Sequence, residues 1–188
     1  MQGKDPAEVP GAIFSYPENY RFSTRTVKGV DIFIRPLFAE DLTLLKGFLS
    51  SLSPRSVYLR FLSPVREFGD KMLAQLIRVD HKSHIALAAF PAESSDQSLL
   101  GVARLFIEAD LSVAEFSVVI LDQWQGKGIG AELLSHILEI GNSLKVKKIW
   151  GLVLAENTQM IKLARKLNFE VKRESGSCEY FVSRDFSY

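Results

Sequence analysis

Hydrophobic and polar residues alternate over residues 27–35, where Val30, Ile32 and Ile34 share one face. This period of two predicts a strand, which Pro36 ends. Apolar residues then recur every three or four positions, a spacing typical of helices that bury one side. The helices expected from this spacing cover residues 41–52, 55–61 and 69–77.

Short apolar runs in the middle of the chain predict strands. They cover residues 85–90, 99–107 and 113–121, and the short turn between the last two favours an antiparallel hairpin. Farther on, we expect helices at 129–143 and 157–167 and strands at 148–154, 170–173 and 179–183. This order predicts a mixed α/β fold with an antiparallel first half and one central βαβ unit.

Composition separates the first residues from the rest. Residues 1–26 are rich in Pro, Gly, Ser and charge, and we expect an N-terminal arm that is loose or packs late. The length of 188 residues favours one domain, which we place at residues 27–188. Hydrophobic residues make up 47% of the chain, and phenylalanine occurs 13 times, so a sizeable core can form.

The charge balance, the absence of long apolar runs and the few His and Cys residues limit which partners and sites we expect. Lys and Arg total 23 against 22 Asp and Glu, which gives no electrostatic reason to expect a nucleic acid or an anionic membrane as partner. Residues 1–10 lack the apolar core of a secretory signal, and no run of about 18 apolar residues occurs, so we expect a cytoplasmic protein. His81 and His84 have no third ligand in sight, and Cys178 is the single cysteine, so we expect neither a metal site nor an intrachain disulfide.

Three glycines alternate at Gly126, Gly128 and Gly130, between the strand at 113–121 and the helix at 129–143. The start of a helix leaves backbone N–H groups unpaired and carries partial positive charge. Glycines let a ligand approach the backbone closely. Together these features predict a binding site for an anion such as a pyrophosphate. The alternative is a tight turn with close helix packing.

The glycine spacing alone fits more than one ligand. Residues 126–131 satisfy the dinucleotide fingerprint G-x-G-x-x-A, but residues 148–188 leave no room for the further βαβ repeats of such a fold. Lysines stand where the acidic partner of a ribose is expected, at positions 145, 147 and 148. A P-loop is excluded as well, because Gly128 follows Lys127.

Residues 125–130 match instead Q/R-x-x-G-x-G/A, the coenzyme A pyrophosphate motif of the GNAT superfamily of N-acetyltransferases. The chain resembles this family over residues 27–183, most strongly over 114–169. It resembles the bacterial protein-lysine acetyltransferase branch at residues 51–61, 114–119 and 154–160. The resemblance implies a GNAT fold, with a mostly antiparallel sheet of six to seven strands and helices on both faces. It also implies acetyl transfer from acetyl-CoA to an amine, which in that branch is a protein lysine.

The resemblance further implies which residues hold acetyl-CoA, the cosubstrate. The backbone of the strand residues Val118, Val119 and Ile120 would pair with the pantetheine arm, although these residues also suit an ordinary core strand. Main-chain N–H groups would hold the pyrophosphate, with added contacts from the Gln and Lys side chains, over Gln125, Gly126, Lys127, Gly128, Ile129 and Gly130. Asn157 either caps the following helix or donates a hydrogen bond to the CoA arm.

Glu115 is the candidate catalytic residue. It lies among apolar residues on the strand at 113–121 and shares a face with Ser117 and Val119. A carboxylate in such surroundings needs a partner or has a raised pKa. Acetyl transfer requires a base to deprotonate the acceptor ammonium, and the matching glutamate of the similar branch is that base. The alternative role is an ion pair with Arg104 on the neighbouring strand.

The sequence departs from the family at its general acid. Ala164 stands where many GNAT enzymes have a tyrosine, so the acid is unassigned and Tyr180 is a candidate only by sequence order. The thiolate can also leave with help from amide dipoles alone. An acyl-cysteine at Cys178 is a possible route in principle, but no histidine follows His136 in the sequence. We therefore favour direct transfer in a ternary complex.

Two other functions stay open at this stage. One is acetylation of a small-molecule amine. The other is a non-catalytic acyl-CoA-binding module, in which Glu115 is structural and Ala164 reflects lost chemistry. The sequence defines neither the acceptor, nor the acyl-chain preference, nor the oligomeric state.

Overall fold

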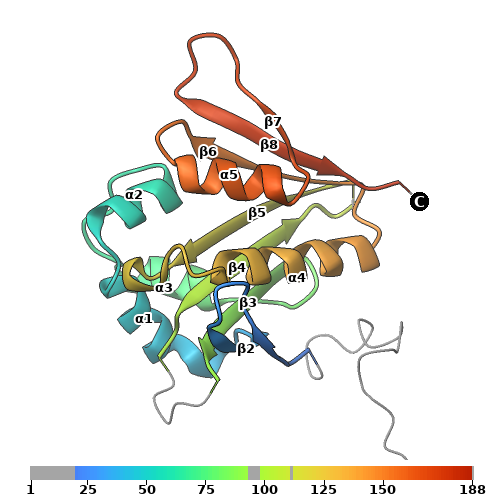
Figure 1. Cartoon of the computed structure of the whole chain (residues 1–188). Helices are drawn as coiled ribbons and strands as arrows, with labels where there is room; N and C mark the ends of the chain where they lie inside the picture. Colours follow the sequence, from blue (N-terminus) through green and yellow to red (C-terminus); the bar gives the residue numbers. More distant parts are fainter. Residues whose placement is uncertain (1–19, 93–97, 111, 188) are drawn as a thin grey trace, which may run out of the picture.

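The computed structural model describes residues 20–92, 98–110 and 112–187. At its centre is an eight-stranded sheet in the order β1-β2-β3-β4-β5-β6-β8-β7 (Figure 1). Its strands are β1 (Phe22–Arg25), β2 (Asp31–Pro36), β3 (His84–Pro91), β4 (Gly101–Ile107), β5 (Val113–Ile120), β6 (Lys148–Leu154), β7 (Glu170–Lys172) and β8 (Glu179–Asp185). All neighbouring strands are antiparallel except β5 and β6, which are parallel.

Helices cover both faces of the sheet, as the amphipathic patterns require. They are α1 (Leu42–Ser50), α2 (Pro54–Phe61), α3 (Asp70–Ile77), α4 (Ile129–Ser143) and α5 (Thr158–Lys166), with short 3-10 turns η3 (Ala39–Asp41) and η4 (Asp122–Trp124). On one face α4 and α5 pack against the strands, and in Figure 1 they run in front of the sheet. On the other face α1 to α3 form a second core against β3 and β4. None of these helices is long and apolar enough to cross a membrane.

The parallel pair β5–β6 is short. Its register runs only from Val113↔Lys148 to Glu115↔Trp150, although both strands continue beyond these residues. The backbone of β5 after Glu115 therefore lacks a partner strand on the β6 side. This place in the sheet is where the candidate site lies.

The predicted fold class and element order are confirmed, and the helix at 129–143 and the strand at 148–154 have the expected bounds. The strand count is eight rather than six to seven. The extra strand is β1, which lies inside the predicted arm.

The last residues of the predicted arm, up to residue 26, are packed into the sheet. Strand β1 pairs with β2, and Tyr20 and Thr26 are buried. The Tyr20 hydroxyl lies 3.1 Å from Nδ1 of His136 on α4, and the Phe22 ring stacks on the same imidazole. These contacts, distant in sequence, fix the segment in place. The predicted arm residues 1–19 lie outside the described part of the chain.

Candidate active site

The glycine-rich loop between η4 and α4 has a backbone conformation that requires glycine, and it is anchored by a neighbouring turn. Gly126 has φ +72° and Gly128 has φ +92°, values that only glycine adopts readily. A β-carbon on Gly128 would lie 3.0 Å from Cβ of Thr26. The Thr26 hydroxyl donates a hydrogen bond of 2.7 Å to the carbonyl of Lys127. The turn between β1 and β2 thus holds this loop in its shape.

The loop presents a row of free backbone donors. Within the described residues, no hydrogen bond uses the backbone N–H of positions 126–130, whereas that of Gln125 donates to the Asp122 carbonyl. These positions lead into α4, a helix of 15 residues whose first N–H groups have no partner inside the helix. Unpaired donors at a helix start favour an anion over a purely structural turn.

A cavity of about 740 Å³ begins at this loop. It extends along β5 between α2 and α5, with the turn after β1 at its rim. Most of the residues that the sequence predicted for the cosubstrate line it, namely Val118, Val119, Ile120, Gln125, Gly126, Gly128, Ile129, Gly130 and Asn157. Lys127 does not line the cavity, because its ammonium lies 4.2 Å from the ring centre of Trp124. Asn157 caps α5 as predicted, and its side chain accepts from the Met160 N–H at 3.1 Å.

The Gln125 side chain, for which the sequence predicted a phosphate contact, binds groups of the protein itself. Its Nε2 donates to Ser56 Oγ at 3.0 Å and to the Ile120 carbonyl at 3.1 Å. The hydroxyls of Ser53 and Ser56 donate in turn to Oδ1 of Asp122, at 2.6 and 2.8 Å. Partial burial would raise the pKa of Asp122, but these hydrogen bonds outweigh it and lower the pKa. This network joins the start of α2 to the glycine-rich loop.

Glu115 lies at a second, smaller cavity of about 70 Å³ between β5, β6 and α2. Both cavities are lined by Leu59, Arg60, Val118, Asn157 and Met160, so the two adjoin. Glu115 is exposed rather than enclosed by its apolar neighbours. The predicted alternative of an ion pair with Arg104 is wrong, since no salt bridge of the described residues includes Glu115.

Arg104 has another partner. It pairs in register with Ser117, and its Nη1 lies 3.1 Å from Nε2 of His84. Burial, with a contribution from the Arg104 charge, lowers the pKa of His84 to about 4, so at neutral pH this imidazole is uncharged and accepts from Arg104. Burial lowers the pKa of Arg104 to about 9, and the nearby Arg60 adds to this effect. Arg60 therefore lies within electrostatic reach of Arg104.

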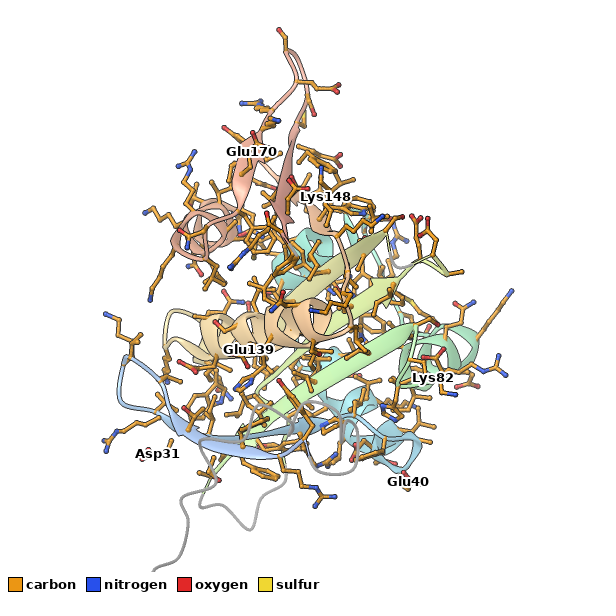
Figure 2. The ribbon with its side chains drawn as sticks, turned by 90° about the vertical axis from the view of Figure 1, so that its right-hand side faces the viewer. Asp31, Glu40, Lys82, Glu139, Lys148 and Glu170 are labelled. Carbon is orange, nitrogen blue, oxygen red and sulfur yellow. The ribbon has the colours of Figure 1, made fainter. Side chains whose placement is uncertain are left out.

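The sheet face around Glu115 is open and partly aromatic. Phe106 is the register partner of Glu115 on β4, and Trp150 is its partner on β6. Phe106 stacks on His84 with ring centres 4.1 Å apart, and Trp150 stacks on Phe181 at 5.5 Å. Phe106, Leu152 and Phe181 are each about 40% exposed. Of the charged side chains that are labelled in Figure 2, Glu170 lies near the top of the view, and Asp31 and Glu40 lie near the bottom.

Other candidates from the sequence lie outside both cavities. Tyr180 pairs with Val153 and packs against the core under α4 and α5. Cys178 is exposed and lines neither cavity. His81 packs against Phe38. Over the described ranges, no cluster of three His, Cys, Asp or Glu side chains could hold a metal.

Several lining residues escaped the sequence analysis. Lys28 comes from the turn after β1, and Ser56 and Arg60 come from α2. Lys162 and Lys166 lie one helical turn apart on α5, a spacing that the sequence displays. Arg60 belongs to the stretch at 51–61 that carries the resemblance, but nothing in that stretch indicates its neighbours.

The sheet parts between β5 and β6, a loop with unpaired amides lies at one end of the gap, and the carboxylate of Glu115 lies at the other. This arrangement suits an acyl-CoA-dependent acyltransferase. The family model described as "Acetyltransferase (GNAT) family" matches residues 55–169. The chain belongs to this family, and it is an acetyl-CoA-dependent acyltransferase.

The chain is similar to several known acetyltransferases. It is 27% identical to acetyltransferase PA5475 of Pseudomonas aeruginosa over 156 residues, which are 83% of this chain and 84% of that protein. It is also 27% identical to acetyltransferase Pat of Mycolicibacterium smegmatis over 143 residues, 76% of this chain but only 42% of Pat. The GNAT domain of S. lividans PAT has the same fold, with a TM-score of 0.81 and 23% identity over 91% of this chain and 99% of that domain.

Proposed function

We propose that this chain transfers an acetyl group from acetyl-CoA to a primary amine, with Glu115 as general base, by direct transfer in a ternary complex. The observation that carries the proposal is that the two cavities adjoin and share five lining residues. The larger one begins at the free amides of residues 126–130, and the smaller one reaches the carboxylate of Glu115. A cosubstrate held by its pyrophosphate at the first end can thus present its thioester near the second.

Residues of the chain have separate tasks along this path. The N–H groups of residues 126–130 bind the pyrophosphate, since they have no other partner among the described residues. The backbone of Val118, Val119 and Ile120 pairs with the amides of the pantetheine arm, because β5 has no partner strand there on the β6 side. Asn157 uses its side-chain oxygen to cap α5, which leaves its NH₂ group to donate to the arm.

Glu115 accepts the proton that the acceptor ammonium must lose before its nitrogen can attack. Its exposure on the open face lets an acceptor reach it from solvent, directly or through one water. We propose a protein lysine as acceptor. Two lines support this: the similarity to the protein acetyltransferase branch, and the exposed apolar side chains of Phe106, Leu152 and Phe181 beside Glu115.

Glu115→Gln tests the base, with Glu108→Gln as the control. Glu108 is an exposed carboxylate in the turn between β4 and β5 and lines neither cavity. We expect Glu115→Gln to lower turnover by about 10²–10⁴-fold while acetyl-CoA still binds, because general base catalysis contributes about that much. Glu108→Gln should retain full turnover.

Two outcomes would contradict the proposal. Unchanged turnover in Glu115→Gln would remove the role of Glu115. Binding of acetyl-CoA without turnover, across protein and small-amine acceptors, would favour a non-catalytic acyl-CoA-binding module. Turnover with small amines but with no protein would replace the lysine acceptor with a small-molecule one.

A further inference from the structure

Acetyl transfer leaves negative charge on the departing sulfur, and this chain lacks the usual residue to neutralise it. Ala164 is fully buried and has only a methyl group. Tyr180 lines neither cavity. A group that could stabilise this charge must instead lie near the junction of the two cavities.

Arg60 is the cation at that junction. It lies in the last turn of α2 and lines both cavities. Burial lowers the pKa of Arg60 to about 10, and the charge of Glu115 partly opposes this. No salt bridge of the described residues includes Arg60, and its guanidinium carbon lies 4.9 Å from the centre of the Phe61 ring. Arg60 is half-buried, so a ligand that carries negative charge is a favourable partner for its guanidinium.

Ser117 provides a second group at the same place. Its hydroxyl is the one fully buried side-chain oxygen or nitrogen, among the described residues, that has no hydrogen-bond partner. It lines the smaller cavity and shares a face of β5 with Glu115. Buried hydroxyls nearly always have a partner, so an orphan one beside a cavity points to a ligand.

The other basic residues near the site are less suited to this role. Lys28, Lys162 and Lys166 are exposed and line only the larger cavity, so solvent and salt screen their charges. Arg104 is buried but lines neither cavity and already contacts His84. Arg60 is the basic residue that both cavities share.

We propose that Arg60 and Ser117 stabilise the negative charge that the thioester acquires during acyl transfer, in place of a general acid. This inference rests on the proposed function. The amine nitrogen bonds to the acyl carbon, the carbon–sulfur bond breaks, and its electron pair stays on sulfur. Glu115 first passes the proton of the acceptor ammonium to water, and it then takes the second proton that the nitrogen loses as the amide forms. The sulfur departs as a thiolate, and the guanidinium of Arg60 and the hydroxyl of Ser117 face it. Because arginine keeps its own proton, the thiolate takes a proton from water after its release.

The test measures the thiol pKa of bound CoA, which requires no acceptor. The difference spectrum between bound CoA and bound desulfo-CoA isolates the ultraviolet absorbance of the thiolate across a pH series. A nearby cation lowers a thiol pKa and a nearby carboxylate raises it. Arg60 and Glu115 are the charged side chains that line the smaller cavity, and Arg104 interacts electrostatically with Arg60. Variants of the first two should therefore shift this pKa in opposite directions.

We expect the bound thiol of the wild type to have a lower pKa than free CoA. Arg60→Gln should raise it by at least one unit, which lowers the thiolate fraction about tenfold well below the pKa. Ser117→Ala should raise it less, and Glu115→Gln should lower it. Arg60→Lys keeps the charge and should stay near the wild type. Arg55→Gln is the matched control, since Arg55 is exposed on the first turn of the same helix and should change nothing.

Turnover gives a second readout. Arg60→Gln should lose about 10²–10³-fold in kcat, like removal of an oxyanion-hole donor, with acetyl-CoA affinity changed only a few-fold. Equal thiol pKa values in the wild type and Arg60→Gln would overturn this inference and leave Glu115 as base unaffected. Failure of the wild type to bind CoA would overturn both proposals together.

Discussion

Alanine at Gly128 should destabilise the protein more than alanine at Gly126 or Gly47. At φ +92° an L-residue costs about 1–2 kcal/mol. The new β-carbon would also lie 3.0 Å from Cβ of Thr26, which cannot retreat freely because its hydroxyl is bonded to the Lys127 carbonyl. Overpacking of this kind adds about 1–3 kcal/mol. We therefore expect Gly128→Ala to lower the free energy of unfolding by about 2–5 kcal/mol.

Alanine substitutions at two further glycines separate the cost of the backbone conformation from the cost of the contact with Thr26. Gly126 has φ +72°, but a β-carbon added there would meet no atom within 4 Å, so Gly126→Ala should show the backbone cost alone, about 1–2 kcal/mol. Gly47 lies in α1 with ordinary φ and open space, so Gly47→Ala should stabilise by about 0.5–1 kcal/mol.

Chemical denaturation of the unliganded variants measures these differences. Each kcal/mol should also move Tm by roughly 2–4 °C for a domain of this size. The reasoning fails if Gly128→Ala is no more destabilising than Gly126→Ala, because the contact with Thr26 would then have no effect. Acetyl-CoA affinity, measured by calorimetry, should fall in Gly128→Ala and stay unchanged in Gly47→Ala.

Two more predictions concern local hydrogen bonds. Asp80 accepts from the Ser83 hydroxyl at 2.6 Å and from three backbone N–H groups, and these bonds hold its pKa well below the usual range despite partial desolvation. Its stabilising effect is present above the unfolded pKa and is lost as pH falls below about 4, so Asp80→Asn should flatten the acid side of a Tm–pH curve; an identical curve would contradict this. Asn157→Ala removes the cap of α5 and should cost about 1 kcal/mol, checked by urea denaturation, whereas Asn157→Ser should recover most of it.

The sequence predicts best those elements whose pattern is long and local. The α4 helix and strand β6 have the expected bounds because their apolar residues repeat over many positions. Strand β1 has only four residues, and its burial depends on His136 and on β2, so no local pattern indicates it. Contacts with residues distant in sequence determine whether such a segment forms a strand.

In the candidate site, too, features of the local chain can be predicted from the sequence, whereas contacts between distant residues cannot. The glycines of the loop indicate an anion site, since unpaired amides at a helix start are a property of the local chain. The Gln125 side chain, by contrast, is bound by Ser56, which lies far away in sequence. Arg60 and Glu115 meet only because α2 packs against β5. Charges brought together in this way have no signature in the sequence.

The first strand of the sheet has a practical meaning for protein engineering. A chain shortened to begin at residue 27 would lose β1 and expose the unpaired edge of β2, a surface that invites aggregation. It would also lose Thr26, whose hydroxyl fastens the loop at Lys127. Such a truncation would therefore impair solubility and cosubstrate affinity together, and any useful fragment of this enzyme must start before Tyr20.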